Sequence, residues 1–179
     1  MEGALSYLNI PNILTIVRIV LIPLFVTTLI YKLYLIALIV FIIAGTTDLL
    51  DGMIARIKKQ ETELGKFLDP LADKFLLVTS FILFAIYGFV PTWLTITVIS
   101  RDLIIVIGWL LITLIFHKTK IQPSMAGKLA NASQLILLAY VLIEMNLREL
   151  NLPRPDPLIG VTALLTIVSG IHYIYRELR

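Results

Sequence analysis

Four aspartates recur at helical spacing within one short stretch of the sequence. They are Asp48, Asp51, Asp69 and Asp73. Residues three or four positions apart share one face of a helix, so each pair is expected to point the same way. Carboxylates that converge repel one another unless cations neutralise them. Because hard oxygen ligands suit Mg²⁺, Mn²⁺ or Ca²⁺, the spacing predicts a site for divalent metal.

The residues beside these pairs favour phosphate chemistry. Gly52 and Gly65 carry no side chain, so a phosphate group can approach the backbone closely there. Arg56 can bind phosphate oxygens through its guanidinium fork. Two metal ions bridged by carboxylates would neutralise a pyrophosphate, and a nearby carboxylate could take the proton of an attacking hydroxyl. The alternative is that the aspartates only cap helices or pair with Lys66 and Lys74, which their number and spacing disfavour.

The elements that position these residues are apolar segments of membrane-spanning length. Of the 179 residues, 59% are hydrophobic and 15% are charged, whereas soluble domains are about half apolar. About 20 apolar residues in a helix cross the hydrocarbon core of a bilayer. Such segments are predicted at residues 12–31, 33–57, 66–87, 92–116, 125–147 and 157–175. We therefore expect an all-α polytopic membrane protein with six transmembrane helices, forming a single domain over residues 1–179.

Basic residues are distributed unequally between the loops. With the N-terminus inside, the inner loops and tail hold Arg56, Lys58, Lys59, Lys66, Lys118, Lys120, Lys128, Arg176 and Arg179. The outer side holds Lys32, Arg148 and Arg154. This positive-inside bias predicts that the aspartates lie at the inner, cytoplasmic face of a bacterial cytoplasmic membrane. Residues 1–9 lack the basic start of a signal peptide and are expected to form a short interfacial helix.

Composition excludes several other kinds of site. The absence of cysteine rules out disulfides, thiolate nucleophiles and iron–sulfur clusters. His117 and His172 do not have the spacing of metal ligands, so any metal would be held by oxygen atoms. A net charge of +3 without interleaved aromatic and basic residues argues against nucleic acid as a partner.

The acidic stretch matches a known signature at each fixed position. It reads Asp48-x2-Asp51-Gly52-x2-Ala55-Arg56-x8-Gly65-x3-Asp69-x3-Asp73. This segment resembles the signature of the CDP-alcohol phosphatidyltransferase family. The resemblance implies six membrane spans, an inward-facing site, membrane lipids as surroundings and a homodimer.

The resemblance also implies roles for the acidic residues. Asp48, Asp51 and Asp69 would bind Mg²⁺ or Mn²⁺, with two ions in the site. Asp73 would be both a metal ligand and the catalytic base.

A second implication concerns the donor substrate. Gly52, Arg56 and Gly65 would contact the CDP moiety of CDP-diacylglycerol. An alcohol would attack the β-phosphorus, joining phosphatidate to the alcohol and releasing CMP. Charge neutralisation and alignment of the hydroxyl, without a covalent enzyme intermediate, would supply most of the catalysis.

The start of the first span contributes candidate residues for the acceptor. Residues 9–18, NIPNILTIVR, resemble the same region of phosphatidylglycerophosphate synthases and of eukaryotic-type cardiolipin synthases. Asn12, Thr15 and Arg18 recur every three residues and would share a helix face. Asn12 could equally be a helix N-cap. Arg18 lies inside an apolar span, so we expect it to require an anion, either a substrate phosphate or the aspartates.

Later segments favour one acceptor over another. Synthases that use glycerol 3-phosphate commonly have Arg-Glu in the fourth span and a second Arg where this chain has Trp109. Here Ser100-Arg101-Asp102 is more similar to cardiolipin synthases, as is Lys128, although Asn131 falls one position later than in that pattern. We therefore expect phosphatidylglycerol as the acceptor, with Arg101 and Lys128 as acceptor-binding residues. Glycerol 3-phosphate is the alternative.

Each of these polar residues also has an alternative interpretation. Arg101 and Asp102 could form an internal ion pair, and Lys128 could be a positive-inside anchor. For Gln134, an interhelical hydrogen bond is the preferred interpretation.

Two other classes of protein are compatible with acidic residues in a membrane. Intramembrane prenyltransferases carry their aspartates in two separated regions of a longer chain, unlike this compact stretch. A small cation transporter would be expected to hold its ion near the midplane of the membrane, between inverted repeats that this sequence lacks. Release of CMP from CDP-diacylglycerol would distinguish the transferase from both.

The metal hypothesis predicts the behaviour of one conservative variant. Asp51→Asn removes a charged ligand but keeps the side-chain shape, so CMP release is expected to vanish while the protein still inserts into membranes. Chelation of divalent ions should stop the wild-type enzyme in the same way. A radiolabelled CMP-release assay measures both effects, and a fully active Asp51→Asn variant would contradict the hypothesis.

Overall fold

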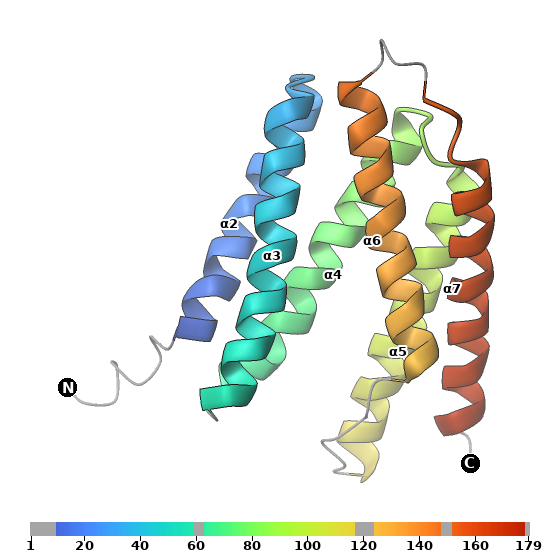
Figure 1. Ribbon diagram of the computed structural model, residues 1–179. Helices are drawn as coiled ribbons and strands as arrows, with labels where there is room; N and C mark the ends of the chain where they lie inside the picture. Colours follow the sequence, from blue (N-terminus) through green and yellow to red (C-terminus); the bar gives the residue numbers. More distant parts are fainter. Residues whose placement is uncertain (1–9, 59–62, 117–123, 148–151, 178–179) are drawn as a thin grey trace. The chain divides into compact units, whose positions relative to one another are not determined.

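A computed structural model shows six helices over the part of the chain that it describes. The backbone is described for residues 10–58, 63–116, 124–147 and 152–177, and side chains for residues 16–47, 74–108, 124–147 and 152–176. The helices are α2 (Ile10–Ile30), α3 (Tyr34–Lys58), α4 (Glu63–Ile86), α5 (Thr92–Phe116), α6 (Met125–Asn146) and α7 (Asp156–Glu177) (Figure 1). These ranges contain no strand. The all-α class and the predicted helical segments are confirmed, whereas the expected interfacial helix at residues 1–9 lies outside the described residues.

A tight turn separates α4 from α5, where the sequence predicted a break between two helical segments. Gly88 has a φ of 76°, a left-handed conformation that glycine adopts without strain. Its N–H donates to the Ala85 carbonyl at 3.1 Å, and the N–H of Phe89 donates to that of Phe84 at 2.9 Å. These bonds satisfy carbonyl groups at the end of α4, and Pro91 then precedes α5. The turn therefore stops α4 and reverses the chain within a few residues.

The chain divides into two compact units, residues 1–79 and 80–179. In the first unit α2 packs against α3, as Figure 1 shows. Phe25 of α2 and Phe41 of α3 are buried and lie with ring centroids 6.0 Å apart. Ala37 and Ala44, both fully buried, are small residues that let the two helices approach closely. This packing holds the part of α3 that leads to the first aspartate pair. That the units form a single domain stays a prediction.

In the second unit α5 and α6 both pack against α7. Apolar residues such as Leu137 and Leu142 are fully buried there, but the interior also contains polar side chains. The buried hydroxyl and amide residues are Ser133, Gln134, Thr162, Thr166 and Ser169. Two contacts show that α6 and α7 are antiparallel. A Cβ atom built on Gly127, early in α6, would lie 3.7 Å from the hydroxyl oxygen of Ser169, late in α7. Further along α6, the Ser133 carbonyl accepts from Thr162, which lies earlier in α7. A polar seam of this kind is typical of helix interfaces inside membranes.

Two described helices have the length and apolar composition needed to cross a bilayer. They are Met125–Asn146 and Asp156–Arg176, and shorter apolar helices run over Ile16–Ile30, Tyr34–Thr47 and Lys74–Ile86. Large apolar side chains also face outward in both units, such as Leu35 at 63% and Ile86 at 72% exposure. Extensive outward-facing apolar surface is what a bilayer covers and water does not.

The contact between α5 and α7 depends on a glycine. A Cβ atom built on Gly108 would lie 2.7 Å from the hydroxyl oxygen of Tyr173. That hydroxyl donates to the Ile105 carbonyl at 3.2 Å, so the ring cannot move without losing the bond. Gly108→Ala is therefore expected to destabilise the protein by about 1–3 kcal/mol through overpacking.

Thermal unfolding in detergent measures this effect. Gly160→Ala is the matched control, because Gly160 lies in α7 and a Cβ there meets nothing within 4 Å. Since alanine favours helix over glycine, Gly160→Ala should leave the melting temperature unchanged or slightly raised. Equal melting temperatures for the two variants would contradict the predicted role of Gly108.

Candidate active site

The two aspartate pairs lie in consecutive helices of the first unit. Asp48 and Asp51 are in α3, which ends at Lys58, and Asp69 and Asp73 are in α4, which begins at Glu63. Both segments are helical, so the members of each pair share a helix face, as predicted from their spacing. Their side chains and that of Arg56 lie outside the described residues, and the surroundings of Gly52 and Gly65 are likewise not described. The metal site and the convergence of the two pairs therefore stay predictions.

Arg18 is a charged residue buried in the described part of the first unit. It lies in α2 and its side chain is completely buried, at 0% exposure. A guanidinium removed from water needs an anion or several hydrogen-bond acceptors to offset its desolvation. Asn12 and Thr15 precede it in the same helix, although their side chains are outside the described part. Because α2 begins at Ile10, Asn12 lies within the helix and does not match the N-cap alternative.

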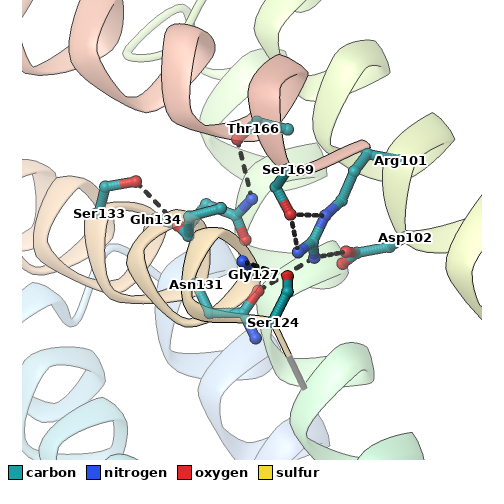
Figure 2. Close-up of polar contacts among 10 residues, drawn as sticks. Arg101, Asp102, Ser124, Gly127, Asn131, Ser133, Gln134, Thr166 and Ser169 are labelled. Atoms are coloured by element: carbon teal, nitrogen blue, oxygen red, sulfur yellow. Dashed lines mark hydrogen bonds and ion pairs between the residues drawn. The ribbon is translucent and has the colours of Figure 1, made fainter. Parts of the chain in front are cut away.

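The second unit brings Arg101 together with residues from three helices, as Figure 2 shows. Nη1 of Arg101 lies 2.7 Å from an Asp102 carboxylate oxygen and donates to Asn131 Oδ1 at 3.1 Å. Nε and Nη2 both donate to the hydroxyl oxygen of Ser169, at 3.2 and 2.6 Å. Arg101 is 6% exposed and Asp102 is 4% exposed. The guanidinium thus links α5 to α6 through Asn131 and to α7 through Ser169.

The first turn of α6 lies against this guanidinium. Ser124 is the N-cap residue, and its hydroxyl oxygen accepts a hydrogen bond from the N–H of Gly127 at 3.0 Å. A Cβ atom on Gly127 would be 3.3 Å from Nη2 of Arg101, so this glycine allows the close approach. Lys128 follows Gly127 and is exposed. A second cation therefore lies in the helical turn that Arg101 touches.

The neighbouring residues confirm two of the structural alternatives. Arg101 and Asp102 do form an internal ion pair. Gln134 is fully buried and donates through Nε2 to the hydroxyl of Thr166 at 3.1 Å, which is the predicted interhelical hydrogen bond. Lys128 is compatible with either of its two interpretations, because it is exposed at the start of α6.

Sequence reasoning missed the neutral partners of Arg101. Asn131 was noted only as a displaced match to a pattern, and Ser169 and Gly127 were not noted. A signal was present in α7, where Thr162, Thr166 and Ser169 recur four and three residues apart on one helix face. Such a row of hydroxyls in an apolar helix predicts polar partners on its neighbours.

A comparison with protein-family models decides the class of protein. The model for CDP-alcohol phosphatidyltransferase matches residues 8–172. The chain belongs to the CDP-alcohol phosphatidyltransferase family. It is therefore a transferase of phospholipid biosynthesis, and neither a prenyltransferase nor a cation transporter finds support.

Curated relatives match almost the whole chain. The CDP-diacylglycerol–glycerol-3-phosphate 3-phosphatidyltransferase of Bacillus subtilis is 33% identical over 185 residues, which cover 94% of this chain and 95% of the relative. The Haemophilus influenzae protein of the same name is 36% identical, over 93% of this chain and 91% of its own length. A probable phosphatidylglycerophosphate synthase of Mycobacterium tuberculosis is 30% identical, over 99% of this chain and 85% of its own.

The ion pair of Arg101 with Asp102 predicts that substitutions at these two residues have non-additive effects on stability. Asp102→Ala would leave the buried Arg101 with neutral partners alone, which is expected to cost about 3–5 kcal/mol of stability. Replacing both residues, as Arg101→Met with Asp102→Ala, removes the uncompensated charge and should recover most of that loss. Melting temperatures of the single and double variants in detergent measure the coupling. A double variant no more stable than Asp102→Ala would refute it.

Proposed function

We propose that the protein transfers a phosphatidyl group from CDP-diacylglycerol to glycerol 3-phosphate, releasing CMP. The observation that carries this proposal is full-length similarity to enzymes whose names specify this acceptor, at 33% and 36% identity. It favours the alternative acceptor over phosphatidylglycerol, which was preferred from the sequence. The product would be phosphatidylglycerophosphate.

The contacts of Arg101 explain why the sequence preference was weak. It rested partly on Asp102 standing where glutamate is common, but the Asp102 carboxylate pairs with Arg101 at 2.7 Å as a glutamate could. The cation at position 101 is kept in either case. The other argument was Trp109, whose side chain lies outside the described residues. One substitution at the far end of α5 is a poor guide to the acceptor when Arg101 and Lys128 are present.

The donor substrate is assigned to α3 and α4. Four carboxylates on two helices form a hard oxygen donor set that fits two Mg²⁺ or Mn²⁺ ions, with Asp48, Asp51, Asp69 and Asp73 as ligands. When bound, the ions would neutralise the pyrophosphate of the donor. Gly52 and Gly65 would let the CDP moiety approach the backbone, and Arg56 would bind a phosphate oxygen.

The chemical step requires a base and an aligned hydroxyl. Asp73 would take the proton of the primary hydroxyl of glycerol 3-phosphate. The hydroxyl oxygen then forms a bond to the β-phosphorus, the bond from that phosphorus to the bridging oxygen breaks, and CMP departs with the electron pair. Arg101 and Lys128 would bind the acceptor phosphate, with Arg18 as a further candidate.

The proposed setting is a bacterial cytoplasmic membrane crossed by six spans, with the site on the cytoplasmic side. Two described helices of spanning length and the outward-facing apolar side chains support a membrane location. The positive-inside charge pattern supports the orientation. A homodimer is the assembly that the family resemblance implies.

An acceptor assay tests the proposal directly. Purified enzyme is given CDP-diacylglycerol with Mg²⁺ and either glycerol 3-phosphate or phosphatidylglycerol, and the lipid product is identified by mass spectrometry. We expect phosphatidylglycerophosphate and stoichiometric CMP from glycerol 3-phosphate. Cardiolipin formed from phosphatidylglycerol, with no product from glycerol 3-phosphate, would overturn the proposed acceptor while leaving the family chemistry intact.

A further inference from the structure

Ser169 accepts two hydrogen bonds from Arg101, whereas Asp102 and Asn131 each accept one. Its hydroxyl oxygen accepts from both Nε and Nη2, at 3.2 and 2.6 Å, and therefore holds one edge of the guanidinium. Ser169 is 1% exposed, so no water competes for its hydroxyl. A fork bound to a fixed acceptor is fixed in its plane as well as in its position.

Most N–H groups of the Arg101 guanidinium have an acceptor among the described residues. A guanidinium has one N–H on Nε and two on each Nη. Ser169 takes the Nε hydrogen and the Nη2 hydrogen on the same edge, while Asp102 and Asn131 take those of Nη1. One Nη2 hydrogen is left over, and it lies on the edge that Nη2 shares with Nη1. That edge is where a phosphate could bind through two oxygens, in place of the residue, Asp102 or Asn131, that accepts the Nη1 hydrogen on it.

Gly127 restricts the guanidinium from another side. The nearest atoms to a Cβ built there are Nη2 of Arg101 and the hydroxyl oxygen of Ser124, both at 3.3 Å. A methyl group at this position would push against the nitrogen that carries the remaining donor. Ser169 thus holds Nη2 from α7, and the bare backbone of Gly127 makes room for it in α6.

We propose that Ser169 is a positioning residue, which orients the Arg101 guanidinium so that its Nη edge receives the phosphate of the acceptor. This role rests on the proposed function, in which the acceptor is glycerol 3-phosphate. Ser169 does not touch the substrate. It acts through Arg101, so its loss should weaken acceptor binding more than the chemical step.

The first test replaces the hydroxyl group. Ser169→Ala removes both hydrogen bonds on the Nε edge, and hydrogen bonds to charged groups are strong enough for an effect of about tenfold. We expect the KM for glycerol 3-phosphate to rise about tenfold, with kcat within about twofold and the KM for CDP-diacylglycerol unchanged. Ser169→Thr keeps the hydroxyl and should restore the KM for glycerol 3-phosphate.

Thr166→Val is the matched control. Thr166 is also buried in α7, one turn before Ser169, but its hydroxyl accepts from Gln134 and makes no bond to Arg101. This variant loses a buried interhelical hydrogen bond between neutral groups, so it reports the cost of loosening the α6–α7 interface without a change at Arg101. Its KM for glycerol 3-phosphate should stay at the wild-type value.

Gly127→Ala tests the same orientation in a different way and serves if Ser169→Ala does not fold. The added methyl group would lie 3.3 Å from Nη2, so it is expected to displace that nitrogen and raise the KM for glycerol 3-phosphate. The melting temperature in detergent is measured beside the KM. A merely structural role would change the two measurements together.

The outcomes separate this role from the proposed function. If the wild-type enzyme does not use glycerol 3-phosphate, both fail. If it does, and Ser169→Ala or Gly127→Ala leaves the KM for glycerol 3-phosphate unchanged, the positioning role alone is overturned. It is also overturned if Thr166→Val raises that KM as much as Ser169→Ala does.

Discussion

A guanidinium inside a helix bundle must have its donors satisfied, and this requirement organises the second unit. Arg101 is 6% exposed, and its partners come from its own helix and from two others. The charge is offset by Asp102, while the orientation depends on neutral acceptors, Asn131 and Ser169. Other contacts join these helices in pairs, such as Tyr173 with Ile105 and Gln134 with Thr166, whereas Arg101 contacts all three. Hydrogen bonds to one rigid, planar group restrict how the three helices pack, because each donor has a fixed direction.

The residues proposed to bind the donor and those proposed to bind the acceptor differ in charge and lie on different helices. The acidic residues assigned to the donor are all in α3 and α4, whereas Arg101 and Lys128, assigned to the acceptor, are in α5 and α6. Carboxylates attract metal ions and cations attract phosphate, so each set of residues has the sign of charge that its proposed ligand requires. In the second unit the buried ion pair of Arg101 with Asp102 occupies only part of the guanidinium.

Sequence reasoning predicted the helices well because apolar runs and turn residues are local signals. Gly88 and Pro91 marked the break between α4 and α5, and the acidic signature gave the family. Sequence reasoning could not predict the hydrogen bonds from Arg101 to Ser169, because the two residues are 68 positions apart and serine is common at many helix interfaces. The sequence favoured phosphatidylglycerol partly because of Trp109, whereas the names of the relatives favour glycerol 3-phosphate. A substitution removes one cation without revealing which others serve in its place. The convergence of the aspartates lies outside the described side chains and stays a prediction.

The adjacency of Asp102 to Arg101 also bears on how the chain is made. During synthesis α5 emerges before α6 and α7, so in a chain with the proposed six spans Arg101 would enter the bilayer before Asn131 and Ser169 are available. A lone arginine at the centre of an inserting helix costs about 2.5–3.5 kcal/mol. Asp102 is the next residue, and its carboxylate lies 2.7 Å from Nη1 in the folded protein. The two residues would therefore enter the bilayer together as a pair without net charge. The ion pair would thus lower the cost of inserting α5, and α6 and α7 would then supply the remaining hydrogen-bond acceptors of Arg101.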